Sequence, residues 1–432
     1  MLGLYSSLMG ASTFFLRALL NRRCRQGKED PLRLEERMGV AGRERPEGAL
    51  VWFHGASVGE SQSMLILIDA LLEQYPTLNI LVTTGTVTSA GLMEKRLPQQ
   101  AFHQYYPLDH PQWVEKFLAH WQPDLALWME SEIWPNMLRA MQKQKIPAAI
   151  VNARLSPQSF KRWKLAAGEI GKLLEAFSVC LTQTEEDAVF FRRLGAQNVI
   201  VSDNLKYSSA PLSYDEDDLK KLKTALGDRP LWLYASTHDA EEEIACRLHK
   251  HLQKKIPDLL TVIVPRHPER RDDIFKACEK YGLRIKLRGL SKKLPEAKDN
   301  IYIADTMGEL GLFYRLSPIA CIGRTFSHDG GGGHNPIEAA QLNCAVLHGP
   351  RIQNLAQVFE EFDRAGAALP VKTEKEFETR LERLLTDHDG MEAIQNKAHN
   401  FAQDKAKVLA TVLKILSPLL LTLETGQKRT CA

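Results

Sequence analysis

Glu60 stands where a strand passes through a loop of small residues into a helix, a place suited to acid–base chemistry. The loop reads His54-Gly55-Ala56-Ser57-Val58-Gly59. Small residues let the backbone turn sharply and approach a ligand, and a helix N-terminus favours an ionised carboxylate. Glu60 is therefore a candidate general base. The alternative interpretation is a carboxylate that only helps to cap its helix.

Two further carboxylates follow another strand, in the run Trp128-Met129-Glu130-Ser131-Glu132-Ile133-Trp134-Pro135-Asn136. Carboxylates this close can orient hydroxyl groups or shift each other's pKa. Alternatively, one caps the helix that Pro135 opens while the tryptophans pack, so at least one of Glu130 and Glu132 is expected to be structural. Lys206, at the end of the same half of the chain, can neutralise a phosphate or a carboxylate, or be an ordinary solvated lysine.

The second half of the chain carries polar residues at four successive strand-to-helix turns. Arg266 and Arg270 are suited to bidentate contacts with phosphate or carboxylate, and Glu338 can hold ribose hydroxyls. Backbone N–H groups at helix starts also bind anions, so the four turns together predict a nucleotide site. The turns are Ser236-Thr237-His238, Pro265 to Arg270, Asp305 to Leu310, and the run Gly330 to Gly333 followed by His334-Asn335-Pro336-Ile337-Glu338.

Composition argues against several other classes of function. The net charge of +3 gives no indication of nucleic-acid binding. The seven cysteines form no CxxC pair, which favours free thiols in a reducing compartment. The thirteen histidines form no HExxH or HxH motif, so no metal site is predicted, and the dinucleotide fingerprint GxGxxG is also absent.

Short apolar runs alternate with helical patterns along the whole chain, which predicts parallel, doubly wound sheets. A polar stretch near residue 215 separates two halves, each large enough to bury a core. Ligands bind at the carboxyl ends of strands in such sheets. The predicted strands are 49–54, 80–84, 125–129, 148–151, 179–182 and 199–202 in the first half, and 231–235, 260–264, 301–304, 319–322 and 345–347 in the second.

Residues 1–25 are predicted to be a membrane anchor, inserted in the bilayer or lying in its interface. The first twenty are apolar or small apart from Ser, Thr and Arg17, and the basic run 22–25 follows them. That order is the reverse of a cleaved signal peptide, and it keeps the rest of the chain in the cytoplasm. The alternative is a buried helix packed on the first domain. The second apolar run, 408–423, contains Lys414 and Pro418 and reads as a packed helix.

In this order, these motifs resemble the bacterial 3-deoxy-D-manno-octulosonic acid (Kdo) transferases of lipopolysaccharide assembly. That family moves Kdo from CMP-Kdo to a lipid A precursor. The matching runs cover nearly the whole chain: 57–60, 130–136, 152–156, 205–206, 236–238, 265–270, 305–310 and 334–338.

The resemblance implies a GT-B type glycosyltransferase with two facing Rossmann-like domains and an N-terminal membrane-anchor helix. The domains implied by the sequence are 26–210 for the acceptor, a linker 211–228, 229–410 for the CMP-sugar, and 411–432 as a C-terminal helix and tail. It also implies attachment to the inner membrane, with the catalytic domains on its cytoplasmic face, and no metal, other cofactor or nucleic-acid partner.

The resemblance also implies a role for each site residue. Glu60 is implied as proton acceptor, with Glu130 and Lys206 stabilising the transition state. The implied CMP contacts are Pro265, Arg266, Met307, Gly308, Glu309, Asn335, Pro336, Ile337 and Glu338. Two positions depart from the family, which usually has glycine where Asp203-Asn204 precedes Leu205-Lys206, and again at Arg324.

The predicted reaction is one inverting displacement on lipid IVA, without a covalent glycosyl–enzyme intermediate. Another double-Rossmann sugar-nucleotide enzyme, a UDP-sugar transferase or an epimerase, is the alternative. A catalytically dead, membrane-tethered sugar-nucleotide binder is a third possibility, but binding alone does not require the set Glu60, Glu130 and Lys206.

Overall fold

The computed structural model of the chain describes residues 2–208 and 210–424. The chain divides into two compact units. The N-terminal unit comprises Met1–Ser208 and Lys407–Ala432, and the C-terminal unit comprises Ser209–Ala406.

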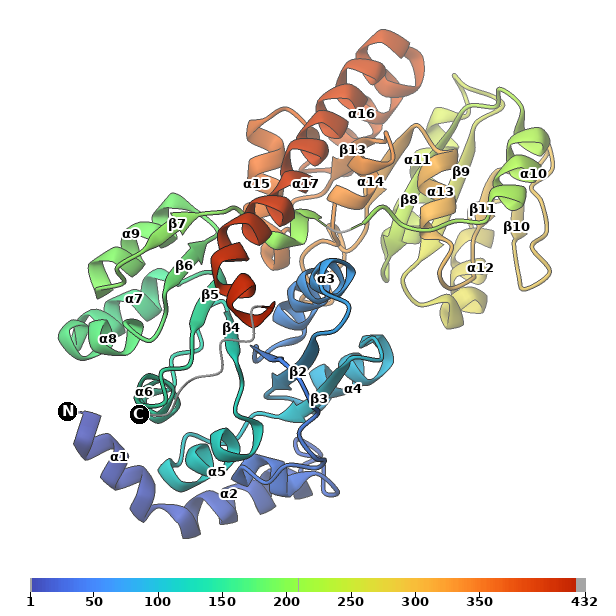
Figure 1. The fold of residues 1–432 in the computed structure, drawn as a ribbon. Helices are drawn as coiled ribbons and strands as arrows, with labels where there is room; N and C mark the ends of the chain where they lie inside the picture. Colours follow the sequence, from blue (N-terminus) through green and yellow to red (C-terminus); the bar gives the residue numbers. More distant parts are fainter. Residues whose placement is uncertain (1, 209, 425–432) are drawn as a thin grey trace. The chain divides into compact units, whose positions relative to one another are not determined.

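The N-terminal unit is built on a parallel sheet of seven strands in the order β3-β2-β1-β4-β5-β6-β7 (Figure 1). Its central strands are buried on both faces, which is why they read as continuous apolar runs. The strands are β1 (Leu50–His54), β2 (Asn79–Thr84), β3 (Ala101–Tyr105), β4 (Leu125–Met129), β5 (Ala148–Ala153), β6 (Val179–Thr182) and β7 (Val199–Val201).

Helices cover both faces of this sheet. Leu50 and Trp52 of β1 pack in one core with α5, α6 and α8, whereas Val51 and Phe53 pack in another with α3, α4 and α17. The alternation arises because successive strand residues point to opposite faces. The helices are α3 (Val58–Gln74), α4 (Val87–Arg96), α5 (Pro111–Trp121), α6 (Pro135–Lys143), α7 (Pro157–Lys164), α8 (Ala167–Leu174), α9 (Glu185–Leu194), η1 (Leu34–Met38) and η2 (Leu205–Ser208).

The C-terminal unit repeats the architecture with a parallel sheet in the order β10-β11-β9-β8-β12-β13-β14. Its strands are β8 (Leu231–Thr237), β9 (Leu260–Pro265), β10 (Ile285–Leu287), β11 (Ile301–Ile303), β12 (Ile319–Ile322), β13 (Ala345–His348) and β14 (Ala368–Pro370). Its helices are α10 (Glu216–Leu226), α11 (Glu241–Leu252), η3 (Pro268–Arg270), α12 (Arg271–Glu279), α13 (Leu310–Leu316), α14 (Ile337–Gln341), η4 (Gln353–Leu355), α15 (Ala356–Arg364) and α16 (Glu374–Thr386), followed by α17 (His388–Glu424).

In both sheets the strand order reverses beside the first strand of the unit. β1 lies between β2 and β4, and β8 lies between β9 and β12. At such a reversal the loops after two neighbouring strands separate and leave room for a ligand. The register pairs His54 with Trp128 in one sheet and Ala235 with Ile322 in the other. The loops that follow these residues therefore begin side by side.

The prediction of two Rossmann-like halves is confirmed, and each sheet holds strands that the sequence patterns missed. The missed strands are β3, β10 and β14, and each lies at the edge of its sheet. Edge strands are only partly buried, as in β10, where all three residues are half-exposed. They therefore lack the continuous apolar run that reveals a central strand.

The N-terminal segment predicted as one anchor helix folds as two helices, α1 (Leu2–Ala11) and α2 (Thr13–Arg25), which are separated at Ser12. Neither approaches the roughly 20 residues needed to span a bilayer. Within the N-terminal unit, α1 packs against α5 and α6, and α2 contacts α1 (Figure 1). The Tyr5 hydroxyl donates to Asp109 Oδ2 over 3.0 Å, and Thr13 Oγ1 lies 2.9 Å from His110 Nε2.

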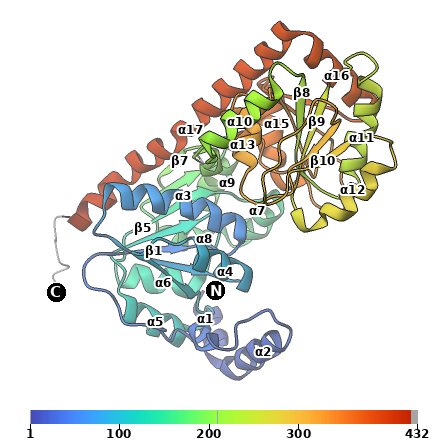
Figure 2. The ribbon, with the colours of Figure 1, turned by 90° about the vertical axis from the view of Figure 1, so that its right-hand side faces the viewer.

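Among the described residues, one helix is long and apolar enough to cross a membrane, and it is α17. It runs as a single helix through Pro418 (red in Figure 2). Val412 and Leu416 are fully buried in the core of the N-terminal unit. A core helix passes the same length and composition test, but only 22% of the apolar window of α17 is buried, so burial accounts for one face of its apolar sequence and not for the whole. The predicted boundary at residue 410 falls within this helix, and α10 occupies most of the predicted linker.

Candidate active site

Glu60 folds back over the loop that precedes its helix. Its carboxylate accepts hydrogen bonds from the backbone N–H of Ala56 at 2.8 Å and of Ser57 at 3.2 Å. The Ser57 hydroxyl donates to it over 2.6 Å and accepts from the Glu60 N–H at 3.3 Å. These bonds form a complete capping box at the start of α3. The capping alternative is therefore present in the structure, and the role as a base stays a prediction.

Glu130 follows β4 in a left-handed conformation, with φ of 55°. Burial raises the pKa of its carboxyl group above the ordinary value, and the negative charge of Glu60 raises it further. The positive charges of Lys206 and Arg154 act in the opposite direction. Glu130 thus lies within the electrostatic reach of both other predicted catalytic residues.

Glu132 is the carboxylate with the more evident structural role. The indole N–H of Trp134 donates to its carboxylate over 2.9 Å, and that of Trp128 donates to its backbone oxygen over 2.6 Å. Burial, followed by the charge of Glu60, raises the pKa of Glu132 to about 7. A substantial share of Glu132 is therefore protonated at neutral pH.

Lys206 lies in η2, which begins after the three residues that follow β7, and the backbone before Lys206 is held by side chains. Asn204 Oδ1 accepts from the Lys206 N–H at 3.0 Å, and Asn152 Oδ1 accepts from the Leu205 N–H at 3.0 Å. A Cβ atom built on Gly59 would lie 3.4 Å from Lys206 Nζ. The ammonium group therefore reaches the first turn of α3, one residue before Glu60.

The departure at Asp203 has a conformational explanation. Asp203 has φ of 65°, in the left-handed region that glycine adopts freely and aspartate tolerates better than most residues. The backbone therefore keeps the course that a glycine would allow. The structure brings Glu60, Glu130 and Lys206 together at the carboxyl edge of the sheet.

His54 and Trp128, which lie just before the loops that carry Glu60 and Glu130, belong to an aromatic cluster that no sequence motif marked as part of the site. His54 stacks on Tyr106 with ring centroids 3.8 Å apart and meets Trp128 edge-on at 4.7 Å. Burial lowers the pKa of His54 to about 3, so the ring is neutral. The signal available was the position of His54 at the end of β1, immediately before the loop.

Asp109 fixes the helix that follows the Glu130–Glu132 turn. Its carboxylate accepts from the backbone N–H groups of Asn136 and Met137 at 3.0 and 2.9 Å, which caps α6 from another loop. Asn136, part of the motif in the sequence, donates its side-chain amide to the backbone oxygen of Asp109 over 2.6 Å. Asn136 therefore has a structural role here.

In the C-terminal unit, Arg266 is exposed directly after the buried Pro265 at the end of β9. Its N–H donates to the Thr237 backbone oxygen at 3.0 Å, which joins two of the predicted turns. Burial raises the pKa of Glu338 to about 7, and the hydrogen bond from Asn335 and the charge of Arg266 oppose this rise. Arg266 therefore lies in the neighbourhood of the run from Asn335 through Pro336 and Ile337 to Glu338.

The turn Met307-Gly308-Glu309 divides into an exposed part and an anchored part. The Met307 side chain is 73% exposed, and Gly308 has φ of 82°. Glu309 is anchored because Arg288 donates to its two oxygens over 2.7 and 2.9 Å. A nucleotide contact through the Glu309 carboxylate must therefore share or displace Arg288.

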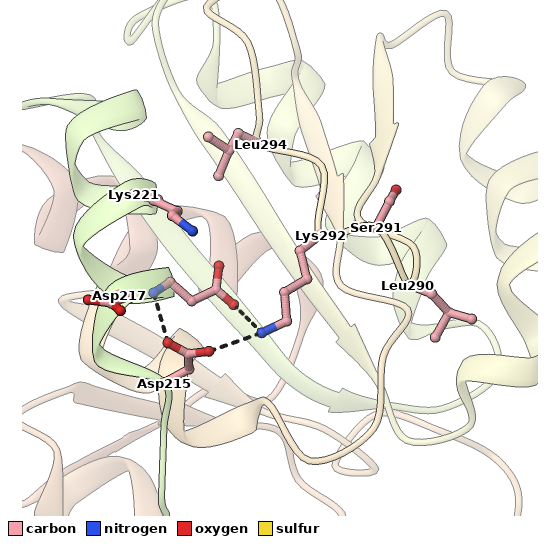
Figure 3. Close-up of a pocket in the computed structure, with 8 residues that line it drawn as sticks. Asp215, Asp217, Lys221, Leu290, Ser291, Lys292 and Leu294 are labelled. Carbon is pink, nitrogen blue, oxygen red and sulfur yellow. Dashed lines mark hydrogen bonds and ion pairs between the residues drawn. The ribbon is translucent and has the colours of Figure 1, made fainter.

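Arg288 is fully buried and also pairs with Asp218 of α10. Lys292 extends the network, with Nζ 2.9 Å from Asp218 and 3.3 Å from Asp215 (Figure 3). A cavity of about 420 Å³ lies beside these groups, lined by Asp215, Asp217, Asp218, Lys221, Leu290, Ser291, Lys292 and Leu294. Lys292 pairs with two of the acidic residues that line this cavity, and with Glu309 Oε1 at 3.6 Å, so the cavity adjoins the anchor of Glu309.

Metal binding has no evident site in the part of the chain that the structure describes. No group of three or more His, Cys, Asp or Glu side chains there is arranged to hold a metal ion.

Comparison with known proteins gives consistent matches. Residues 32–209 match the family model of 3-deoxy-D-manno-octulosonic-acid transferase (kdotransferase). The chain is 34% identical to the 3-deoxy-D-manno-octulosonic acid transferase of Rickettsia bellii, over 90% of this chain and 93% of that one. It is 31% identical to that of Haemophilus influenzae, over 90% and 91%. A glycosyltransferase structure from Rickettsia africae shares the fold, with a TM-score of 0.56 at 12% identity over 87% of this chain and 99% of that one.

Proposed function

Because the chain belongs to the Kdo transferase family of lipopolysaccharide biosynthesis, we propose that it moves Kdo from CMP-Kdo onto the lipid A precursor lipid IVA. The observation that carries this proposal is the gathering of Glu60, Glu130 and Lys206 where the strand order of the N-terminal sheet reverses.

Glu60 is the proposed general base. As the acceptor hydroxyl oxygen attacks the anomeric carbon of Kdo, its proton passes to the Glu60 carboxylate. The new carbon–oxygen bond forms while the bond from that carbon to the phosphate oxygen breaks, and its electron pair leaves with CMP. A single displacement of this kind inverts the anomeric centre and needs no covalent intermediate.

In this proposal, side chains stabilise the charges that the transition state and the donor phosphate carry. Lys206 offsets negative charge that develops on the departing phosphate, and Glu130 acts with it to stabilise the transition state. On the donor side, Arg266 meets the phosphate and Glu338 the ribose hydroxyls. Pro265, Met307–Glu309 and Asn335–Ile337 complete the proposed CMP contacts. No metal ion or other cofactor is required.

The direct test incubates the full chain with CMP-Kdo and tetra-acylated lipid A precursor and reads product masses. The expected products are heavier by whole Kdo residues, and excess EDTA leaves the rate unchanged. CMP, and not UDP, should raise the thermal unfolding temperature. Transfer from a UDP-sugar with none from CMP-Kdo, or epimerisation of a UDP-sugar, would establish the alternative enzyme instead.

We also propose that the protein attaches to the cytoplasmic face of the inner membrane through the outer side of α1 and α2. Four large apolar side chains there are mainly exposed: Leu4 at 66%, Leu8 at 62%, Phe14 at 79% and Phe15 at 74%. The last turn of α2 adds Arg22, Arg23 and Arg25. Apolar residues that enter the interface, with basic residues beside anionic headgroups, are typical of interfacial helices.

Replacement of these four apolar residues by serine tests the attachment without removing the contacts of Tyr5 and Thr13. The variant should lose sedimentation with vesicles that contain anionic lipid. Leu290→Ser is the matched control, because Leu290 is 94% exposed in the other unit. Sedimentation of the fourfold variant at the wild-type level would contradict attachment through this surface.

A further inference from the structure

Four polar side chains form a connected series of contacts in the C-terminal unit, at the point where its strand order reverses. Arg324 Nε lies 3.0 Å from Asp329 Oδ2, and that oxygen lies 2.7 Å from His238 Nδ1. His238 Nε2 lies 2.9 Å from His334 Nε2. This series of contacts joins the loop after β8 to the loop after β12. It ends at His334, one residue before the proposed nucleotide contacts Asn335 to Glu338.

The glycine run 330–333, which lies between Asp329 and His334, is closely packed. A Cβ on Gly331 would lie 2.0 Å from the Arg324 guanidinium carbon, and one on Gly332 would lie 2.3 Å from the backbone nitrogen of Gln353. The Gly331 N–H donates to Asp329 Oδ1 at 3.0 Å, and the Gly333 N–H donates to the Arg324 backbone oxygen at 3.1 Å. The loop therefore has one defined course in this structure, and the ion pair lies inside it.

Arg324 occupies its position at a conformational cost. Its φ of 63° lies in the left-handed region, which is unfavourable for a long side chain and explains why the family usually has glycine here. Residues held in such strained backbone conformations cluster at functional sites. The only side-chain hydrogen bonds of Arg324 within the described residues are those to Asp329, at 3.0 and 3.2 Å.

The hydrogen bonds also determine the protonation pattern. Asp329 accepts from His238 Nδ1–H, so His238 Nε2 of the neutral ring is an acceptor and His334 Nε2–H must be the donor. Burial, together with the positive charge of Arg266, lowers the pKa of His334 to about 3, so this ring is neutral. His334 Nδ1 is then an acceptor. It has no hydrogen-bond partner in the part of the chain that is described.

We propose that Arg324, Asp329 and His238 form a clasp that positions His334 and the adjoining run Asn335–Glu338 for the sugar nucleotide, with His334 Nδ1 accepting from an amino or hydroxyl group of that ligand. Arg324, Asp329 and His238 are positioning residues, since they act through His334. This inference rests on the proposed function, because it assumes that the C-terminal unit binds CMP-Kdo.

The substitution Arg324→Gly tests whether the Arg324 side chain positions the binding loop or only stabilises the fold. Glycine relieves the left-handed strain, which offsets the lost ion pair, so the unfolding temperature should stay within ~2 °C of wild type. The affinity for CMP should nevertheless fall about tenfold, because the clasp no longer orders the binding loop. The KM for CMP-Kdo should rise, and the KM for the lipid acceptor should not.

Two further variants complete the test. Asp329→Asn should weaken CMP binding by a similar factor, and the double variant should be no weaker than either single one, because both break the same pair. Asn343→Gly is the control: φ there is 61°, on an exposed turn of the same unit, so it should leave CMP binding intact.

Amide hydrogen exchange of residues 329–338 without ligand should accelerate in both clasp variants. Unchanged CMP affinity in both, or exchange as slow as in wild type, would overturn the clasp. If the wild-type protein itself binds no CMP, the proposed function fails, and the clasp is then judged by exchange alone.

Discussion

The comparison of Glu60→Gln with Ser57→Ala separates a catalytic carboxylate from a capping one. Both residues belong to the same capping box, and only Glu60 can accept a proton from a substrate. The two substitutions therefore disturb the same helix end, but only one removes the proposed base.

The stability cost of each substitution can be worked out from the hydrogen bonds. The Glu60 carboxylate accepts from Ala56 N, Ser57 N and Ser57 Oγ at 2.8, 3.2 and 2.6 Å. Glutamine keeps one acceptor oxygen, so at least one bond of about 1 kcal/mol is lost. A further ~0.5 kcal/mol of stability is lost because the neutral amide no longer interacts with the helix dipole as the carboxylate charge does. Ser57→Ala removes the cap, for about 0.5–2 kcal/mol. The two variants should unfold with similar losses of stability.

Their activities should differ sharply. Loss of a general base lowers kcat by about 10²–10⁴-fold, so Glu60→Gln should fall by this factor and Ser57→Ala by less than about tenfold. The assay is the initial rate of Kdo transfer at saturating CMP-Kdo, together with CMP affinity and urea unfolding for both variants. CMP affinity should stay at the wild-type level. Equal rates in the two variants would show that Glu60 is only a cap and would refute the assignment.

Three other predictions concern stability and backbone geometry. Burial raises the pKa of Asp109 to about 6, so its stabilising contribution is complete below pH ~4 and is lost as pH rises through 6. The difference in urea unfolding free energy between wild type and Asp109→Asn should therefore change by about 2 kcal/mol between pH 4 and 7, and a constant difference would contradict this. Leu416→Ala should cost about 2–5 kcal/mol because Leu416 is fully buried, whereas Leu421→Ala, at a half-exposed position of α17, should cost under about 1 kcal/mol; equal costs would contradict the docking of α17. Asp203→Gly should keep the transfer rate within about twofold, since glycine adopts φ of 65° freely, and Asp203→Val should lower it more than about tenfold; similar rates would show that this backbone does not place Lys206.

The sequence predicted the parts of the fold that depend on local pattern. Central strands such as β1 and β4 were visible because burial on both faces requires a continuous apolar run. The edge strand β10 was not visible, because its half-exposed residues do not require a continuous apolar run. The break at Ser12 was also missed, because it accompanies contacts such as Tyr5 with Asp109, which lie 104 residues apart.

The candidate site shows the same division. Glu60 was readable because its loop, helix start and carboxylate are contiguous in sequence. Two other contacts could not be read from the sequence, because they join residues that are far apart in it. They are the Arg288–Glu309 pair, 21 positions apart, and the contact of His238 with His334, 96 positions apart. Local pattern therefore located the groups that do chemistry, and only the tertiary structure shows what holds them.

Five residues other than glycine take left-handed conformations at or just beyond the carboxyl ends of strands: Glu130, Asn152, Asp203, Ser236 and Arg324. Each is a place where glycine or asparagine would fold at least as easily. A laboratory selection for heat resistance alone would therefore tend to replace the long side chains among them. Such a selection would enrich proteins that survive heating and transfer poorly, because stability gained at strained functional positions is commonly lost from activity. Thermotolerant variants of this chain should be sought elsewhere, with Glu130 and Arg324 held fixed.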